Sequence, residues 1–138
     1  MALLRPEHIK EIAKYVAMGE IVFVHKNSRK IQPMPKPEES VEEWKEKCAV
    51  LEADNKNWLK IKTVPLDDEL HLRKEFIEEA TNQHVKKQLS NALNRKNPMR
   101  NFQHVIESDE ILHQHWRNYK KVAYQNWVTN FVIDQYNY

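Results

Sequence analysis

Basic side chains near one proline could bind an anion. Pro98 is typical of the first position of a helix, and the unpaired amides and dipole at a helix N-terminus favour negative charge. An arginine fork can also hold a phosphate through two hydrogen bonds. The pattern predicts an anion-binding surface, to which two lysines of the last helix would contribute if that helix lay alongside. The candidate residues are Arg95, Lys96, Arg100, Lys120 and Lys121.

The same cations could instead serve the fold alone. Arg95 and Lys96 would then neutralise the carbonyl end of the preceding helix, where cations are stabilising without a ligand. Arg100 would pair with Glu107 or with the acidic middle of the chain. The sequence leaves both interpretations open.

Charge is unevenly distributed along the chain. Residues 36–83 carry eight Lys/Arg and thirteen Asp/Glu, whereas residues 84–121 carry eight Lys/Arg and three Asp/Glu. The balance changes from −5 to +5, although the whole chain has a net charge of only +2. An acidic segment followed by a basic one could steer an anionic partner to the basic one, or the two could simply complement each other.

Histidines, carboxylates and a lone thiol are the other groups that could do chemistry. His113 and His115 lie two residues apart, so on a helix they point about 200° apart and cannot share an ion. Cys48 is the only cysteine and falls on the apolar side of an expected helix, where a thiol is usually inert. The single glycine, Gly19, excludes a P-loop and a Gly-x-Gly-x-x-Gly turn. The sequence predicts no metal and no cofactor.

A carboxylate cluster is the one feature that suggests hydrolysis. Its members are Glu75, Glu78 and Glu79. They could form an acid–base pair, and His71 stands at the i, i+4 position from Glu75. More often, such a cluster is a solvated helix face, here with Arg73 and Lys74 beside it.

Length and composition indicate a cytoplasmic protein of one domain, residues 1–138. A chain of 138 residues with 41% hydrophobic content can build one core without disulfides. Its single cysteine fits a reducing compartment. No apolar run reaches the roughly 20 residues of a membrane helix, and the start lacks a signal-peptide pattern.

The N-terminal half predicts a helix, a hairpin, a second helix and a further strand. The first helix opens at Pro6 and ends at Gly19, and Ser40-Val-Glu-Glu43 predicts a capping box for the second helix. The prolines that begin at Pro33 should forbid further ladder pairing. The predicted strands are Glu20–His25, Arg29–Gln32 and Trp58–Val64.

The chain from Asp67 onward is predicted to be entirely helical. Apolar residues recur there at three- and four-residue spacing. Asp67 or Asp68 should cap the first of four helices, and Ser108 or Asp109 the last and longest. The same spacing makes Trp116 a core residue rather than a platform for nucleobases.

Several motifs resemble a bacterial family of uncharacterised proteins, family 0158. They include Trp58-Leu-Lys-Ile-Lys-Thr-Val-Pro65, Phe76-Ile-Glu78, the run from Leu89 to Phe102, and His113-Gln-His-Trp116-Arg-Asn-Tyr119. The sequence departs from the family pattern at Asn97, which is inserted before Pro98, and at Met99, where phenylalanine is more usual. The resemblance implies an α+β fold and brings no activity or catalytic residues.

We therefore expect an α+β domain with a small antiparallel sheet of about three strands, a hairpin plus one, covered by helices. The C-terminal half should be all helical. The leading functional hypothesis is a non-enzymatic binding protein that presents a basic surface to a nucleic acid or an acidic protein, and no membrane partner is expected. One alternative is a homodimeric interaction module that pairs through an exposed hairpin edge or the C-terminal helix, and the aromatic end Tyr136-Asn-Tyr138 also suggests docking. The other is a hydrolase that uses the Glu/His cluster.

Overall fold

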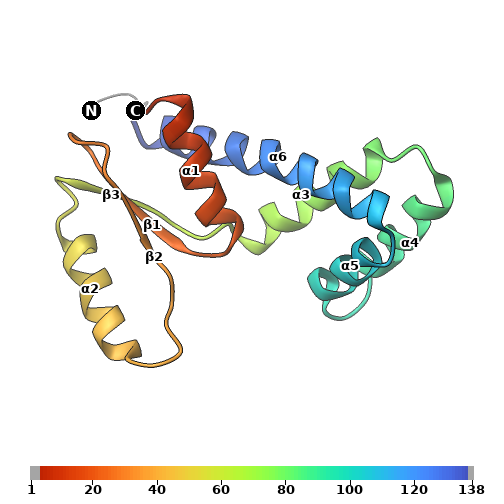
Figure 1. Cartoon of the computed structure of the whole chain (residues 1–138), viewed down its shortest axis with the longest axis horizontal. Helices are drawn as coiled ribbons and strands as arrows, with labels where there is room; N and C mark the ends of the chain where they lie inside the picture. Colours follow the sequence, from red (N-terminus) through yellow and green to blue (C-terminus); the bar gives the residue numbers. More distant parts are fainter. Residues whose placement is uncertain (1–3, 137–138) are drawn as a thin grey trace. The chain divides into compact units, whose positions relative to one another are not determined.

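The computed structural model describes residues 4–136 and confirms an α+β fold (Figure 1). Within these residues the chain forms six helices and one three-stranded antiparallel sheet. In chain order the elements are α1 (Pro6–Ala17), β1 (Ile21–His25), β2 (Ile31–Met34), α2 (Val41–Ala53), β3 (Trp58–Ile61), α3 (Leu66–Glu79), α4 (Gln83–Leu93), α5 (Pro98–Glu107) and α6 (Glu110–Tyr136).

The chain divides into two compact units. Unit 1 comprises residues 1–63 and 124–138, and unit 2 comprises residues 64–123. Helix α6 runs from one unit into the other, and its residues 124–136 belong to unit 1. The expectation of one domain stays a prediction.

Unit 1 contains the sheet, in the order β2-β1-β3. The central strand β1 is apolar along its length, and Val22, Phe23 and Val24 are buried, as expected for a strand covered on both faces. Helix α1 packs against β1 and β2, and α2 packs against β3. Gly19 ends α1 with φ of +80°, a left-handed conformation that a residue without Cβ adopts easily.

Two expectations for unit 1 are wrong in detail. Pro33 does not end the hairpin but pairs with Val22 inside it. Proline has no backbone N–H to donate to a neighbouring strand. The sheet tolerates it here because β2 is an edge strand, and the outer side of an edge strand has no partner strand. Ser40 precedes α2 with φ of +59°, and its side chain makes no capping hydrogen bond, so the predicted capping box does not form.

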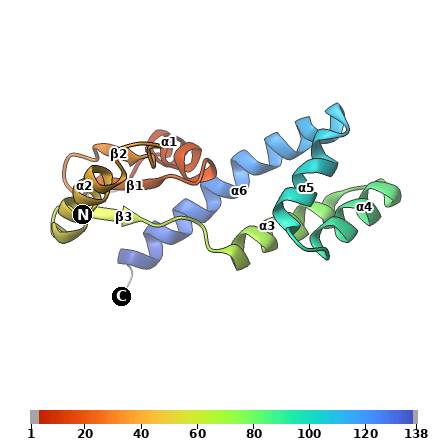
Figure 2. The same ribbon diagram turned by 90° about the horizontal axis from the view of Figure 1, so that it is seen from below.

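Unit 2 is built from α3, α4, α5 and the first half of α6, as predicted for the chain after Asp67. Helices α4 and α5 lie next to each other in Figure 1 and again in Figure 2. Asp109 caps α6 through Oδ1, which accepts hydrogen bonds from the backbone amides of Ile111 and Leu112. Helix α3, however, begins at Leu66 without a side-chain cap, so Asp67 and Asp68 lie in its first turn rather than before it.

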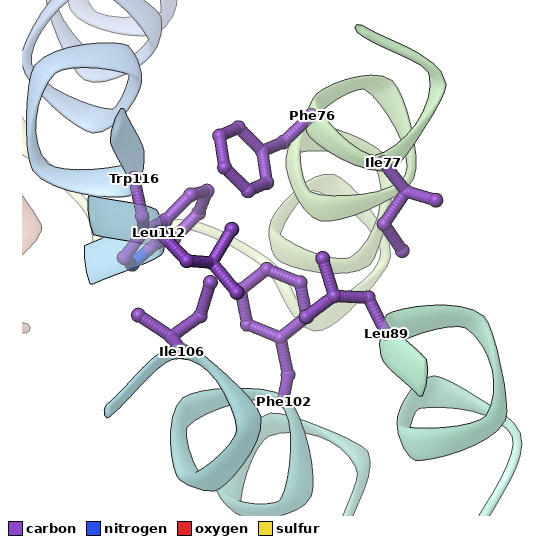
Figure 3. Close-up of a cluster of buried hydrophobic side chains, with 7 residues drawn as sticks. All are labelled: Phe76, Ile77, Leu89, Phe102, Ile106, Leu112 and Trp116. Carbon is purple, nitrogen blue, oxygen red and sulfur yellow. The ribbon is translucent and has the colours of Figure 1, made fainter. Parts of the chain in front are cut away.

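One aromatic and aliphatic cluster forms the core of unit 2 (Figure 3). Helix α3 contributes Phe76 and Ile77, α4 contributes Leu89, α5 contributes Phe102 and Ile106, and α6 contributes Leu112 and Trp116. The rings meet edge-on at centroid distances of 5.0 Å for Phe102–Trp116 and 5.1 Å for Phe76–Trp116. Trp116 is only 2% exposed and is therefore a core residue, as its spacing predicts.

Candidate functional site

Three of the predicted anion-binding residues lie together in the chain at the junction between α4 and α5. We call Arg95, Lys96 and Arg100 the basic corner; all three are exposed. The turn between the helices is fixed by a hydrogen bond of 2.7 Å from Asn101 Nδ2 to the carbonyl oxygen of Lys96. Asn97 adopts a left-handed conformation with φ of +59° and makes no side-chain cap, so its side chain leaves the first amides of α5 unpaired.

The cations of the basic corner have no acidic partner in the described part of the chain. Among residues 4–136, no ion pair or side-chain hydrogen bond involves the charged head of Arg95, Lys96 or Arg100. Glu107, the expected partner of Arg100, instead accepts a hydrogen bond of 3.1 Å from Gln103 Nε2. The pairing of Arg100 with Glu107 that the sequence also allowed is therefore not observed, whereas Arg95 and Lys96 do directly follow the end of α4, where cations are stabilising.

The two lysines of α6 occupy different environments. Lys121 is exposed, whereas Lys120 is half-buried. Burial lowers the pKa of Lys120, the neighbouring Arg73 lowers it further, and Glu69 acts in the opposite direction. Lys120 thus belongs to an internal charge cluster with Arg73 and Glu69, and Lys121 is the better placed of the two to meet a partner.

Arg73 is buried in unit 2, and the expectation that it lies on a solvated face is wrong. The residue is 8% exposed. Its Nη1 donates to the carboxylate of Glu69 over 2.8 Å and to the carbonyl oxygen of the same residue over 2.9 Å. The guanidinium carbon lies 5.2 Å from the ring centroid of Trp116 and 5.5 Å from that of Phe102, within the range of cation–π attraction.

The position of Arg73 in the helical repeat carries a signal that our sequence reasoning missed. Arg73 stands three residues before the buried Phe76 and four before the buried Ile77, which puts it on the inward stripe of α3. Its Nε is buried and has no hydrogen-bond partner among the described residues. Periodicity alone places this residue inside, whereas its charge favours the solvent.

The carboxylate cluster lies at the C-terminal end of α3. Glu75 accepts a hydrogen bond of 3.3 Å from the hydroxyl of Tyr119 and makes a contact of 2.7 Å with His71 Nε2. Burial, followed by the charges of Glu75, Glu79 and Glu78, raises the pKa of Tyr119 to about 12. The phenol therefore stays neutral at physiological pH and can donate a hydrogen bond.

An open groove of about 450 Å³ lies beside the C-terminal end of α3, within unit 2. Apolar side chains, including Phe76, Val85 and Leu112, line it together with polar ones. The polar part includes Glu79, Asp109, His115 and Tyr119. We call this feature the acidic groove, because its lining carries two carboxylates and no Lys or Arg.

Three further predictions concern metal binding, the membrane and a homodimer. No group of three or more His, Cys, Asp or Glu side chains within the described chain could hold a metal ion. None of the helices described is long and apolar enough to cross a membrane. The aromatic end that suggested a homodimer falls outside the described structure, since residues 137–138 and the side chain of Tyr136 are not part of it.

A comparison with protein families gives one match. The model of Uncharacterised protein family (UPF0158) matches residues 19–137, which is most of the chain. This match confirms the resemblance drawn from the sequence motifs. No curated protein and no solved structure matches the chain.

Proposed function

The chain belongs to Uncharacterised protein family UPF0158, and we propose that its basic corner binds a nucleic acid. The observation that carries this proposal is that Arg95, Lys96 and Arg100 are exposed and have no carboxylate partner within residues 4–136. Phosphate groups of a nucleic-acid backbone are the natural partners for such cations, because each contact releases condensed counterions. We also propose that the protein acts without catalysing a reaction, in a bacterial cytoplasm, in keeping with its single cysteine.

Local geometry supports an anion at this place. The first turn of α5 adds partial positive charge to that of the side chains, and the side chain of Asn97 does not satisfy its amides. Arg100 supplies a planar fork for bidentate contact, and Lys96 a compact charge. Lys121, on α6, is also exposed.

The experiment compares the parent chain with an Arg95→Ala, Lys96→Ala, Arg100→Ala variant. Binding to fluorescently labelled RNA and duplex DNA is followed by anisotropy at several salt concentrations. Three lost phosphate contacts should reduce the slope of log K against log salt by about 2–3 and weaken binding at every sequence tested. Polyglutamate serves as a second ligand, because a surface that binds an acidic protein would bind it too.

A matched control removes three exposed lysines of unit 1, Lys36, Lys56 and Lys62, and so makes the same change in net charge. This control should keep the salt dependence of the parent. Unchanged binding in the basic-corner variant would overturn the proposal, and so would equal loss in the control. Retention of polyglutamate but not of polynucleotide would assign the surface to an acidic protein instead.

A further inference from the structure

We propose that the acidic groove binds a small organic cation, an ammonium or guanidinium group carried on a short apolar chain or ring. This inference concerns a different part of unit 2 from the basic corner and does not depend on nucleic-acid binding. It rests on the size of the groove, the chemistry of its lining and the uncompensated charge at the end of α3.

The size and lining of the groove suit a small molecule. Its volume of about 450 Å³ falls in the range of about 300–1,000 Å³ that is usual for small-molecule sites. Phe76 and Leu112 belong both to its lining and to the rigid core of unit 2, so this part of the wall is preformed. The apolar wall would take the hydrocarbon part of a ligand, and the carboxylates would take its charge.

The negative charge at this end of α3 is not paired by basic side chains within residues 4–136, apart from the contact of Glu75 with His71. Helix C-termini favour cations, yet the last turn of α3 contains no basic residue. Instead it contains Glu78 and Glu79, neither of which makes an ion pair within residues 4–136. Glu75, one turn earlier, has only His71 as an ion-pair partner in this range. A bound cation would supply the charge that the helix end lacks.

Asp109 and Tyr119 provide further groups that a cation could contact. Oδ1 of Asp109 is used in capping α6, whereas its Oδ2 makes no hydrogen bond with any described residue. The Tyr119 ring is held against Phe76 at a centroid distance of 5.2 Å and is stacked on Trp116 at 6.1 Å. An aromatic face fixed in this way attracts ammonium and guanidinium groups. Because its pKa is raised to about 12, the phenol does not itself carry a negative charge at neutral pH.

The side-chain charge of the lining argues against an anionic ligand, and amides at the N-termini of α4 and α6, which also border the groove, are already capped by Asn82 and Asp109. Glu79 and Asp109 face the groove from two different helix ends, and its only nitrogen base is His115. The groove therefore selects against phosphates and carboxylates, in contrast to the basic corner.

The test uses three probes of nearly equal shape on the full chain: 2-phenylethylamine, 2-phenylethanol and phenylacetate. Amide chemical shifts in nuclear magnetic resonance report both the affinity and the place of binding. We expect the amine to shift the amides around residues 76–85 and 109–119, and the alcohol and the acid to bind at least about tenfold more weakly. 2-Phenylethylguanidine in place of the amine tests the guanidinium form of the ligand.

Glu79→Gln and Asp109→Asn each remove one charge from the groove, and asparagine keeps the oxygen that caps α6. Each should weaken amine binding by about tenfold or more. The matched control is Glu110→Gln, which removes an exposed charge on α6 outside the groove and should leave amine binding within about twofold.

Three results would overturn the proposal. They are the absence of amine-dependent shifts at millimolar probe, equal binding of the alcohol, and equal loss in Glu79→Gln and Glu110→Gln. Loss of amine binding would leave nucleic-acid binding by the basic corner unaffected, so the two proposals fail separately.

Discussion

Replacing Glu69 with glutamine should destabilise the protein more than replacing its partner Arg73 with methionine. The side chain of Arg73 is 10% exposed, that of Glu69 is 17% exposed, and the two meet at 2.8 Å. Breaking a fully buried pair by removing one partner costs about 3–5 kcal/mol, and an exposed pair contributes about 0–1 kcal/mol. Glutamine keeps a neutral acceptor beside the guanidinium, so we expect Glu69→Gln to lower the free energy of unfolding by about 2 kcal/mol.

Arg73→Met should lower the free energy of unfolding by only about 1 kcal/mol or less. Methionine fills a similar volume between Phe102 and Trp116, and the change removes both the buried charge and the Nε that has no partner. The carboxylate of Glu69, which is left behind, retains some contact with solvent. Loss of the cation–π contacts accounts for most of the expected cost.

Urea unfolding followed by circular dichroism measures both variants, provided that the m-value stays constant. A matched control is Glu42→Gln, which breaks a surface pair with Lys45 whose side chains are 87% and 61% exposed, and which should change stability by less than about 0.5 kcal/mol. The reasoning is refuted if Glu69→Gln is as mild as this control. It is also refuted if Arg73→Met is the more damaging change, because then the guanidinium stabilises the core rather than depending on Glu69.

Other outcomes follow from single contacts. Arg73→Met should raise the pKa of Lys120, and Glu69→Gln should lower it, as measured by the pH dependence of the lysine Cε chemical shift. The Tyr119 phenol should ionise near pH 12 by ultraviolet absorbance; because its pKa is about 10 when unfolded, the stability it contributes is complete below pH 10 and is lost as the pH rises towards 12. Gly19→Ala should cost about 1 kcal/mol in thermal unfolding through backbone strain alone, since no atom lies within 4 Å of the added Cβ. Asn82→Ala should cost about 1 kcal/mol because its Oδ1 caps α4, whereas Ser40→Ala should be nearly neutral.

Periodicity and helix-end chemistry predicted most of the elements. The apolar run of β1 and the inward stripe of α6 depend on local spacing, so they could be identified without tertiary information. Strand β3 ends at Ile61, three residues before the predicted Val64, although the sequence alternates to the end. The alternation does not reveal where a neighbouring strand stops, and here the last pairing of β1 with β3 joins Val22 and Ile61.

The errors share a physical origin in tertiary context. Pro33 is acceptable only because β2 lies at the edge of the sheet, and strand order is not written in a local pattern. Ser40 has the right type for a cap, but its backbone is left-handed and its side chain makes no capping hydrogen bond. Arg73 is buried because aromatic rings from α5 and α6 cover its guanidinium, and those helices begin more than twenty residues later.

The same distinction applies to the candidate sites. The sequence identified the basic corner because its members are close in the chain, and the structure adds that they lack acidic partners within residues 4–136. The sequence predicts only part of the acidic groove, because Glu79 and Asp109 are thirty residues apart and come together only through the packing of unit 2. Local clusters are visible in a sequence, whereas concave surfaces are not.

Fold stability does not explain the separation of charge within unit 2. The basic corner lacks acidic partners and the end of α3 lacks basic ones in the described chain, although both lie within residues 64–123. Surface ion pairs contribute only about 0–1 kcal/mol each, so pairing these groups would add little stability and leaving them unpaired costs little. Substitutions at either place should therefore change ligand binding without unfolding the protein. That independence makes loss of binding in the basic-corner variant, or in Glu79→Gln, direct information about the ligand.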